Sequence, residues 1–371
     1  MKTKEKMKLH WVTKPHGHVA NALGYNIHNS QMLKHIEKYV DLDETADIAI
    51  TITPADQFFP VPGKFNVLFS MWEFLDLPET YVQGINKADL ILVPCRFCKD
   101  VFSRYTKKPI EVCWEGVDPE VYRYHERKPS VPFRFLWVGA PNPRKGYPVI
   151  LQAVQILEQL DNVEIYIKTT VPKINWWQFF RNLWNKRMDI IKDRGKIVPF
   201  WRMLRRLPRP QLADRVIRYG KKKNIVFDTR KLPIEELIAL YNSAHCFVLP
   251  SFGEGWGLTL CEAMATGAPC VATKNTGTAD FFDEQVGYVV EHGTRELDLR
   301  DYKLKTRGYE PSGKSTIEQM FKVMREYPEA LRRGRAASRR ILEKFTWDRS
   351  AKRLHDILRR HAPCQPLQKQ T

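Results

Sequence analysis

The segment that most constrains the fold is 251–265, SFGEGWGLTLCEAMA, which sets Glu254 and Glu262 eight positions apart around a glycine-rich turn. A short apolar run of strand type, 245–250, precedes the turn, and a stretch with helical spacing follows it and ends at Gly267. In a parallel α/β sheet, such a strand–turn–helix unit places its turn at the carboxyl edge, where ligands bind. The segment therefore predicts a ligand site in a parallel α/β domain.

The turn combines an anion site with two carboxylates. Its three glycines let a ligand approach the backbone, and the amides of Gly257, Leu258 and Thr259 would face outward at a helix N-terminus, which favours an anion. Because carboxylates repel phosphate, the pairing favours an anion that also carries hydroxyl groups, such as a nucleotide sugar. The alternative is that Glu254 and Glu262 only complement the helix dipole.

EGWGLTLCE, followed by AMATGAPCVAT and NTGTAD, resembles the E-x7-E signature of the retaining, nucleotide-sugar-dependent glycosyltransferases of family four, which have the GT-B fold. The resemblance implies that Glu254 contacts the donor sugar and Glu262 the nucleotide ribose. It also implies that the backbone of Gly277 and Thr278 helps to seat the donor. A nucleotide sugar would be the donor substrate, with no cofactor.

A second strand–turn–helix pattern occurs at 137–154, WVGAPNPRKGYPVILQAV. It places Arg144 and Lys145 in a turn, where cations would neutralise a diphosphate leaving group in the transition state. In the family that the chain resembles, this loop supplies an arginine right after the first glycine and a lysine before the next. Lys145 matches the lysine, whereas Ala140 follows Gly139, so Arg144 is the candidate substitute. The alternative is a solvated Arg-Lys pair.

Strands alternate with helices twice along the chain, which predicts two Rossmann-like, doubly wound domains facing across a cleft, as in GT-B. We expect an acceptor-side domain over 1–128 and a nucleotide-sugar-binding domain over 129–345. By resemblance, the C-terminal helix of 346–371 packs back onto the first domain.

The acceptor side should lie in loops at the strand ends of the first domain. The candidates there are Gly17, His18, Trp72 and Glu73. Glu73 or a histidine could orient an acceptor hydroxyl, although local packing is an equal alternative for Trp72 and His18. Asp41 and Asp43 fit the Asp-x-Asp letters of metal-dependent glycosyltransferases, but we interpret them as surface residues. We expect no metal, because helix amides and Lys145 can supply the same electrostatic stabilisation.

The net charge of +18 is concentrated in one segment. Residues 173–223 hold 16 Lys/Arg against three acids, together with four of the ten tryptophans. This insertion could lie on an anionic membrane and bring the enzyme to a lipid-linked acceptor, it could bind nucleic acid, or it could pack on its own domain as a lid.

The bulk sequence favours a soluble protein of the cytoplasm, with membrane association as a further option. No apolar run approaches the eighteen or so residues of a membrane span, and no apolar stretch follows the basic start to suggest a signal peptide. The seven cysteines are scattered, which favours a reducing compartment.

The sequence therefore predicts a metal-independent, retaining glycosyltransferase that acts on a glycan or lipid-linked acceptor. One alternative is a glycosyltransferase that modifies nucleic acid. The other is a non-catalytic protein that binds nucleotide sugars or nucleic acid, for which the missing arginine is the support.

Overall fold

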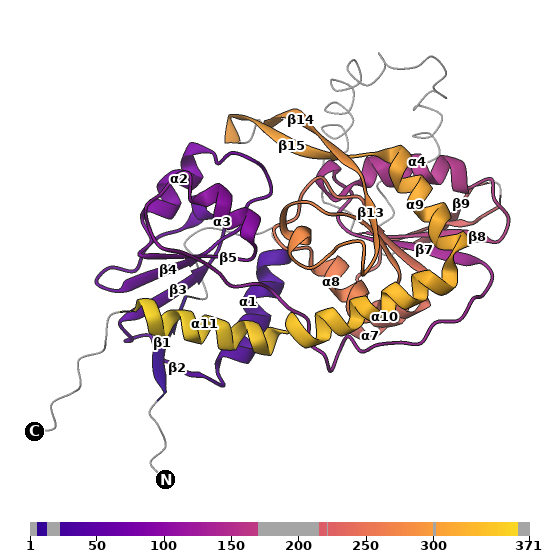
Figure 1. The fold of residues 1–371 in the computed structure, drawn as a ribbon. Helices are drawn as coiled ribbons and strands as arrows, with labels where there is room; N and C mark the ends of the chain where they lie inside the picture. Colours follow the sequence, from indigo (N-terminus) through magenta and orange to yellow (C-terminus); the bar gives the residue numbers. More distant parts are fainter. Residues whose placement is uncertain (1–5, 13–22, 170–214, 221, 300–301, 363–371) are drawn as a thin grey trace, which may run out of the picture.

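The computed structural model describes residues 6–12, 23–169, 215–220, 222–299 and 302–362. They form two α/β lobes, the N-terminal one in indigo and purple and the C-terminal one in magenta to orange in Figure 1. Of the basic segment 173–223, only 215–220 and 222–223 are described, so the rest of this insertion, with its four tryptophans, lies outside the described residues. Within the described part, Val216–Tyr219 forms a strand, β9.

The N-terminal lobe is built on a sheet of six parallel strands. These are β1 (Met7–Trp11), β2 (Val40–Leu42), β3 (Ile48–Ile52), β4 (Phe65–Phe69), β5 (Leu90–Val93) and β6 (Ile110–Val112). Their order is β2-β1-β3-β4-β5-β6. Every residue of β3 and β5 is buried, which explains why both strands read as continuous apolar runs in the sequence. The helices are α1 (Leu23–Ile36), α2 (Glu79–Asn86) and α3 (Arg96–Phe102), with the 3₁₀ turn η1 (Ala55–Gln57).

The C-terminal lobe repeats this plan around a seven-stranded sheet. Its other strands are β7 (Phe133–Val138), β8 (Val163–Lys168), β10 (Ile225–Asp228), β11 (Cys246–Leu249), β12 (Cys270–Thr273) and β13 (Tyr288–Val290). The order is β13-β12-β11-β7-β8-β10-β9, in which β9 alone is antiparallel to its neighbour. The predicted α/β architecture of two doubly wound lobes is thus confirmed.

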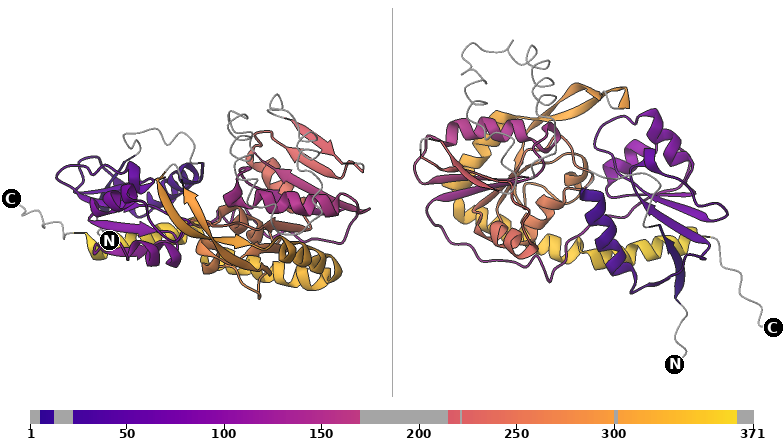
Figure 2. Two further views of the ribbon diagram at one scale, coloured as in Figure 1. Left: turned by 90° about the horizontal axis from the view of Figure 1, so that it is seen from above. Right: turned by 180° about the vertical axis from the view of Figure 1, so that it is seen from behind.

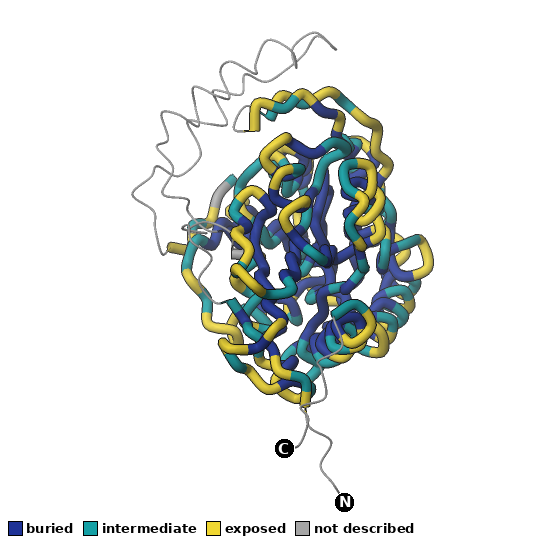
Figure 3. Tube along the Cα trace, turned by 90° about the vertical axis from the view of Figure 1, so that its left-hand side faces the viewer, coloured by how far each residue is buried: buried dark blue, intermediate teal, exposed yellow. Residues whose placement is uncertain are grey.

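Helices cover the C-terminal sheet and continue to the end of the described chain. They are α4 (Tyr147–Leu157), α7 (Ile234–Ser243), α8 (Leu258–Ala265), α9 (Gly313–Arg325), α10 (Tyr327–Lys344) and α11 (Trp347–His361). The 3₁₀ turns are η2 (Pro143–Lys145) and η3 (Thr276–Asp280). Figure 3 shows the buried strands in dark blue inside an exposed outer layer. Among the described helices, none is long and apolar enough to cross a membrane.

Helix α11 leaves the C-terminal lobe and packs under the N-terminal sheet (Figure 1). Trp347, Ala351, Leu354 and Leu358 recur at helical spacing and are buried with β1 and β3 in one apolar cluster. The entry to α11 is tied down as well, because the amide of Trp347 donates to the Val117 carbonyl at 3.1 Å.

A buried arginine anchors the segment that joins the two lobes. Arg127 is 6% exposed. Its guanidinium donates to the carbonyl oxygens of Tyr241, Ala244 and Thr266 and to the Thr266 hydroxyl, at 2.6–3.0 Å. Burial lowers the pKa of Arg127 to about 10. Because the donors meet carbonyl ends of the C-terminal lobe, the linker is fixed to that lobe.

A two-stranded antiparallel hairpin, β14 (His292–Leu299) and β15 (Leu304–Pro311), extends from the C-terminal lobe to the N-terminal one. Figure 2 shows it in orange between the lobes. The amide of Leu75 donates to the Arg307 carbonyl at 3.2 Å, and the Thr306 hydroxyl donates to Asp76 Oδ2 at 2.8 Å. Periodicity does not reveal the hairpin, because β14 has no buried residue.

Gly116 gives a test of how α11 is docked. A Cβ atom there would lie 2.3 Å from the Thr346 carbonyl carbon and 2.5 Å from the Trp347 nitrogen. We expect Gly116→Ala to lower the free energy of unfolding by about 2 kcal/mol, because backbone must move. Urea unfolding measures it. The matched control is Gly24→Ala, where a Cβ meets no atom within 4 Å; equal effects of the two variants would contradict the close packing.

Candidate functional site

The glutamate turn lies where the sequence predicts it, between β11 and α8 at the carboxyl end of the strand. Gly257 is the N-cap of α8 and has φ +108°, a conformation that favours glycine. No side chain caps the helix. The first-turn amides of Leu258 and Thr259 therefore remain available to an anionic ligand.

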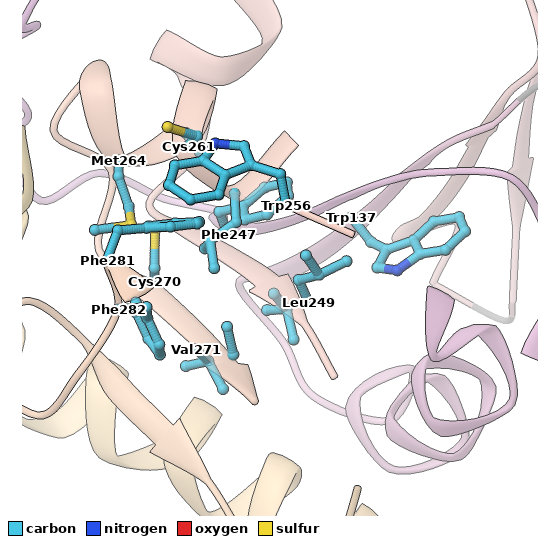
Figure 4. Close-up of a cluster of buried hydrophobic side chains, with 14 of the residues drawn as sticks. Trp137, Phe247, Leu249, Trp256, Cys261, Met264, Cys270, Val271, Phe281 and Phe282 are labelled. Carbon is cyan, nitrogen blue, oxygen red and sulfur yellow. The ribbon is translucent and has the colours of Figure 1, made fainter. Parts of the chain in front are cut away.

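A buried core holds this turn in place (Figure 4). Trp256 is 1% exposed and packs against Phe281 and Phe345, with ring centroids 4.8 and 5.3 Å apart. Phe281 follows η3, and Phe345 follows α10, so three separate segments meet under the turn. Because Trp256 is fixed in this core, the backbone position of Glu254, two residues earlier in the turn, is fixed as well.

Glu254 meets Lys145 from the second predicted turn. Lys145 Nζ lies 2.6 Å from Glu254 Oε2, and the two side chains are 18% and 4% exposed. The lysine is positioned by η2, where Asn142 Oδ1 accepts from the Lys145 amide. Gly146 follows with φ +74°, and a Cβ there would lie 2.0 Å from the Pro250 oxygen. Glycine at 146 therefore allows the two turns to touch.

Arg144 joins the same cluster and reaches the other lobe. Its Nη1 donates to the Gly253 carbonyl at 2.8 Å and lies 3.6 Å from Glu254 Oε2. It also lies 3.3 Å from Oε1 of Glu73, which comes from the loop after β4. The nearby carboxylates of Glu73 and Glu254 raise the pKa of Arg144 against the effect of burial. One guanidinium thus bridges a carboxylate of each lobe.

Glu262 is held by two tyrosines that the sequence analysis did not identify. The Tyr241 hydroxyl donates to Glu262 Oε2 at 2.7 Å. Tyr122 of the interdomain linker is a second neighbour, near enough that its hydroxyl acts to lower the pKa of Glu262. Burial raises the pKa of Glu262 to about 7, although the two hydroxyls and the charge of Lys145 act to lower it. Both tyrosines lie in apolar surroundings, so they resemble ordinary core residues in the sequence.

Two glycines of the turn allow close contact between the lobes. A Cβ at Gly253 would lie 2.5 Å from the Glu73 oxygen, and one at Gly255 would lie 2.5 Å from Met71 Sδ. At these two positions the absence of a side chain makes room for the loop after β4.

The remaining donor candidates surround Glu254. A Cβ at Gly277 would lie 2.4 Å from the Gly255 oxygen, and the Gly277 amide donates to the Glu254 carbonyl. The Thr278 hydroxyl is buried and donates to the carbonyl oxygens of Thr273 and Asn275, and its amide donates to the Asn275 side chain. Gly139 ends β7, with its amide bonded to the Lys168 carbonyl.

Two buried oxygens of the site, Glu254 Oε1 and Thr259 Oγ1, have no hydrogen-bond partner among the described residues. A buried acceptor without a partner costs free energy that a bound hydroxyl or water would restore. Both atoms lie beside the uncapped end of α8. The arrangement can therefore accept a ligand that brings hydroxyl groups next to an anionic group.

On the acceptor side, Gly17 and His18 lie outside the described residues. Trp72 is 2% exposed, and its Nε1 donates to the Asp76 carbonyl at 2.8 Å. The structure thus favours local packing for Trp72 rather than contact with an acceptor. Of the two candidates that are described, Glu73 is the one linked to Glu254, through Arg144. Within the described residues, no group of three or more His, Cys, Asp or Glu side chains is placed to hold a metal ion.

Residues 204–300, a range that contains both glutamates, match the family model of group 1 glycosyl transferases. A stretch of 126 residues is 30% identical to the D-inositol 3-phosphate glycosyltransferase of Corynebacterium jeikeium, covering 34% of this chain and 26% of that protein. A stretch of 141 residues is 41% identical to the O-antigen chain mannosyltransferase B of Escherichia coli, covering 38% and 28%. The chain thus spans well under a third of the length of these relatives.

A solved structure shares the fold over nearly the whole chain. The Anabaena Alr3699/HepE protein, in complex with UDP and glucose, superposes with a TM-score of 0.61 at 12% identity, covering 96% of this chain and 100% of that one. The fold is GT-B. The chain thus shares this fold over nearly its whole length and is similar to group 1 glycosyl transferases over residues 204–300.

The raised pKa of Glu262 predicts a pH-dependent stability. Between its ordinary value and about 7 the folded state binds the proton more tightly than the unfolded state, so this stabilisation is lost as the pH rises through 7. We expect the free energy of unfolding of the wild type to fall relative to Glu262→Gln between pH 5 and pH 8. Urea titrations of both proteins at four pH values measure the difference; parallel pH profiles would contradict a carboxyl that retains its proton up to about pH 7.

Proposed function

We propose that the protein is a glycosyltransferase that moves a sugar from a nucleotide-sugar donor to a glycan or lipid-linked acceptor, with retention of configuration. The observation that carries the proposal is the pairing of Glu254 with Lys145 at 2.6 Å beside the uncapped N-terminus of α8. The carboxylate suits the sugar hydroxyls of such a donor, and the cation and the free amides suit its diphosphate.

The proposed roles follow the chemistry of each group. The unpartnered Glu254 Oε1 accepts from a hydroxyl of the donor sugar. Glu262 accepts from the ribose hydroxyls, since its carboxylate is already oriented by Tyr241. The amides of Leu258 and Thr259 at the start of α8 face the diphosphate.

Lys145 and Arg144 neutralise the leaving nucleoside diphosphate. The bond from the anomeric carbon to the phosphate oxygen breaks as the acceptor oxygen bonds to that carbon, and the acceptor proton passes to the departing phosphate. Positive charge near that oxygen lowers the barrier most, because negative charge develops there in the transition state. We assign no side chain as a general base, and the proposed reaction needs no metal, since these two cations and the helix amides take its place.

Ala140 stands where the resembling family has an arginine, which is the support for a non-catalytic binding protein. Arg144 places its guanidinium 3.6 Å from Glu254 and so offers the missing charge from another position. This geometry favours an enzyme over a decayed site. An anionic membrane surface, reached through 173–223, is part of the proposal where the acceptor is lipid-linked.

Loss of Lys145 tests catalysis directly. We expect Lys145→Met to lower kcat about 10²-fold or more, because a preorganised charge at the leaving group is removed, and Glu254→Ala to do the same. Release of nucleoside diphosphate from a donor measures it. The matched control is Lys314→Met, since Lys314 is 86% exposed on α9. Unchanged donor consumption in both site variants would show that the site is misassigned.

The identity of the donor can be tested by measuring how nucleotide sugars change the thermal stability of the protein. Only a ligand that binds the folded state raises its stability, by about 2.7 kcal/mol at 100 times Kd. We expect one nucleotide class in a panel of UDP-, GDP-, ADP- and CMP-sugars to raise the Tm by several degrees, and Glu262→Gln to reduce that shift. Binding should strengthen as pH rises through 7, because the ionised Glu262 is the better acceptor. A panel without any shift would contradict the donor site.

A further inference from the structure

The hairpin β14–β15 extends across both lobes, next to the glutamate turn of 251–257, which is called the donor turn below. At its tip, Tyr302 packs against Trp72 and Tyr81 of the N-terminal lobe, with ring centroids 5.2 and 5.9 Å away. Near its base, the guanidinium of Arg295 lies 5.5 Å over the ring of Phe252, which belongs to the glutamate turn. The hairpin therefore rests on both lobes and on the donor turn at once.

An open pocket of about 380 Å³ lies between α3, η3 and the hairpin. Its walls come from the start of α3, from η3 and from the hairpin, and include Arg96, Phe97, Asn275, Asp280, His292 and Tyr309. Its volume lies within the range of small-molecule sites. We call it the hairpin cavity.

The hairpin cavity shares a wall with the proposed donor site. Thr276, which lines the cavity, accepts from the Glu254 amide at 2.8 Å, and the adjacent Gly277 amide donates to the Glu254 carbonyl at 2.9 Å. Two hydrogen bonds therefore tie the wall of the cavity to the backbone of Glu254, the glutamate proposed to contact the donor sugar.

The lining suits an uncharged ligand with an apolar face. Phe97 and Tyr309 lie with ring centroids 6.3 Å apart, and His292 lies 4.8 Å from Tyr309. The cations are neutralised in place. Arg96 Nε lies 3.2 Å from Asp280 Oδ1, and Lys274 lies 3.3 Å from Glu284. No excess positive charge is left to select phosphate, while amide, carboxylate and hydroxyl groups remain to meet hydroxyls.

We propose that the hairpin cavity is an acceptor subsite that binds a neutral sugar ring, with Tyr309 and Phe97 against its apolar face. The inference rests on the proposed glycosyltransferase function and deepens it. It makes the hairpin, a part of the donor-side lobe, a determinant of acceptor choice. Aromatic faces supply contact area at low conformational cost, and the paired polar groups around them set the orientation.

The test uses the full chain and four probes: methyl α-D-mannopyranoside, methyl α-D-glucopyranoside, and the 6-phosphates of mannose and glucose. Ligand-observed NMR titration gives each Kd, with the nucleotide-induced thermal shift as a parallel readout. We expect at least one neutral glycoside to bind, and to bind more tightly than either phosphate. Tyr309→Ala should weaken it about fivefold, while Tyr309→Phe, which keeps the ring, should retain it.

Phe97→Ala provides a second variant outside the hairpin, since Phe97 lies on α3 of the N-terminal lobe. It should also weaken the glycoside about fivefold without changing the nucleotide shift. Tighter binding of the phosphates, no binding by either glycoside, or wild-type affinity in both alanine variants would overturn the subsite while the nucleotide shift persists. Loss of the nucleotide shift in the wild type would instead overturn the proposed function.

Discussion

The buried contact between Lys145 and Glu254 is the interaction on which the rest of the cleft depends. A carboxylate that is 4% exposed loses most of its hydration, and a close cation is what compensates for that loss. The lysine stands there because the left-handed Gly146 lets η2 approach the Pro250 carbonyl. Two turns that are far apart in the chain are therefore joined by one ion pair and one glycine.

The same charge cluster extends across the domain boundary. Arg144 ties Glu254 to Glu73, the glycines at 253 and 255 admit the β4 loop, and the hairpin adds a second bridge. Helix α11 closes the opposite side through its entry at Val117. The relative position of the lobes is thus set at several points. Under the proposed function, a bound diphosphate would compete with both carboxylates for Arg144 and Lys145, so donor entry and lobe contact are coupled.

Much of the fold could be predicted, because buried parallel strands show as apolar runs and the covering helices show as amphipathic periods. The segments that escaped prediction lack such a signal. Helix α2 contains Gly84, which packs so closely on the Ala55 backbone that a side chain would not fit there. Tertiary packing rather than helix propensity therefore favours this helix. Strand β9 is a four-residue edge strand in a basic segment, and β14 has no buried residue.

In the candidate site, Glu254 and Lys145 could be found because each lies in a turn after a strand. Tyr122 and Tyr241 instead act through contacts with Glu262 that no local sequence pattern encodes.

The sequence by itself determined the α/β class, the two lobes and the two turns that carry charge, because each follows from short-range periodicity and glycine placement. Tertiary structure decided which of those charges meet. It placed Arg144 between the lobes, buried Trp72 in the core and gave Glu262 its two tyrosine partners, and it set the hairpin over a cavity beside the donor turn. The physical reason is that hydrogen bonds, ion pairs and desolvation depend on distances between residues that are remote in the chain, and local sequence patterns do not specify those distances.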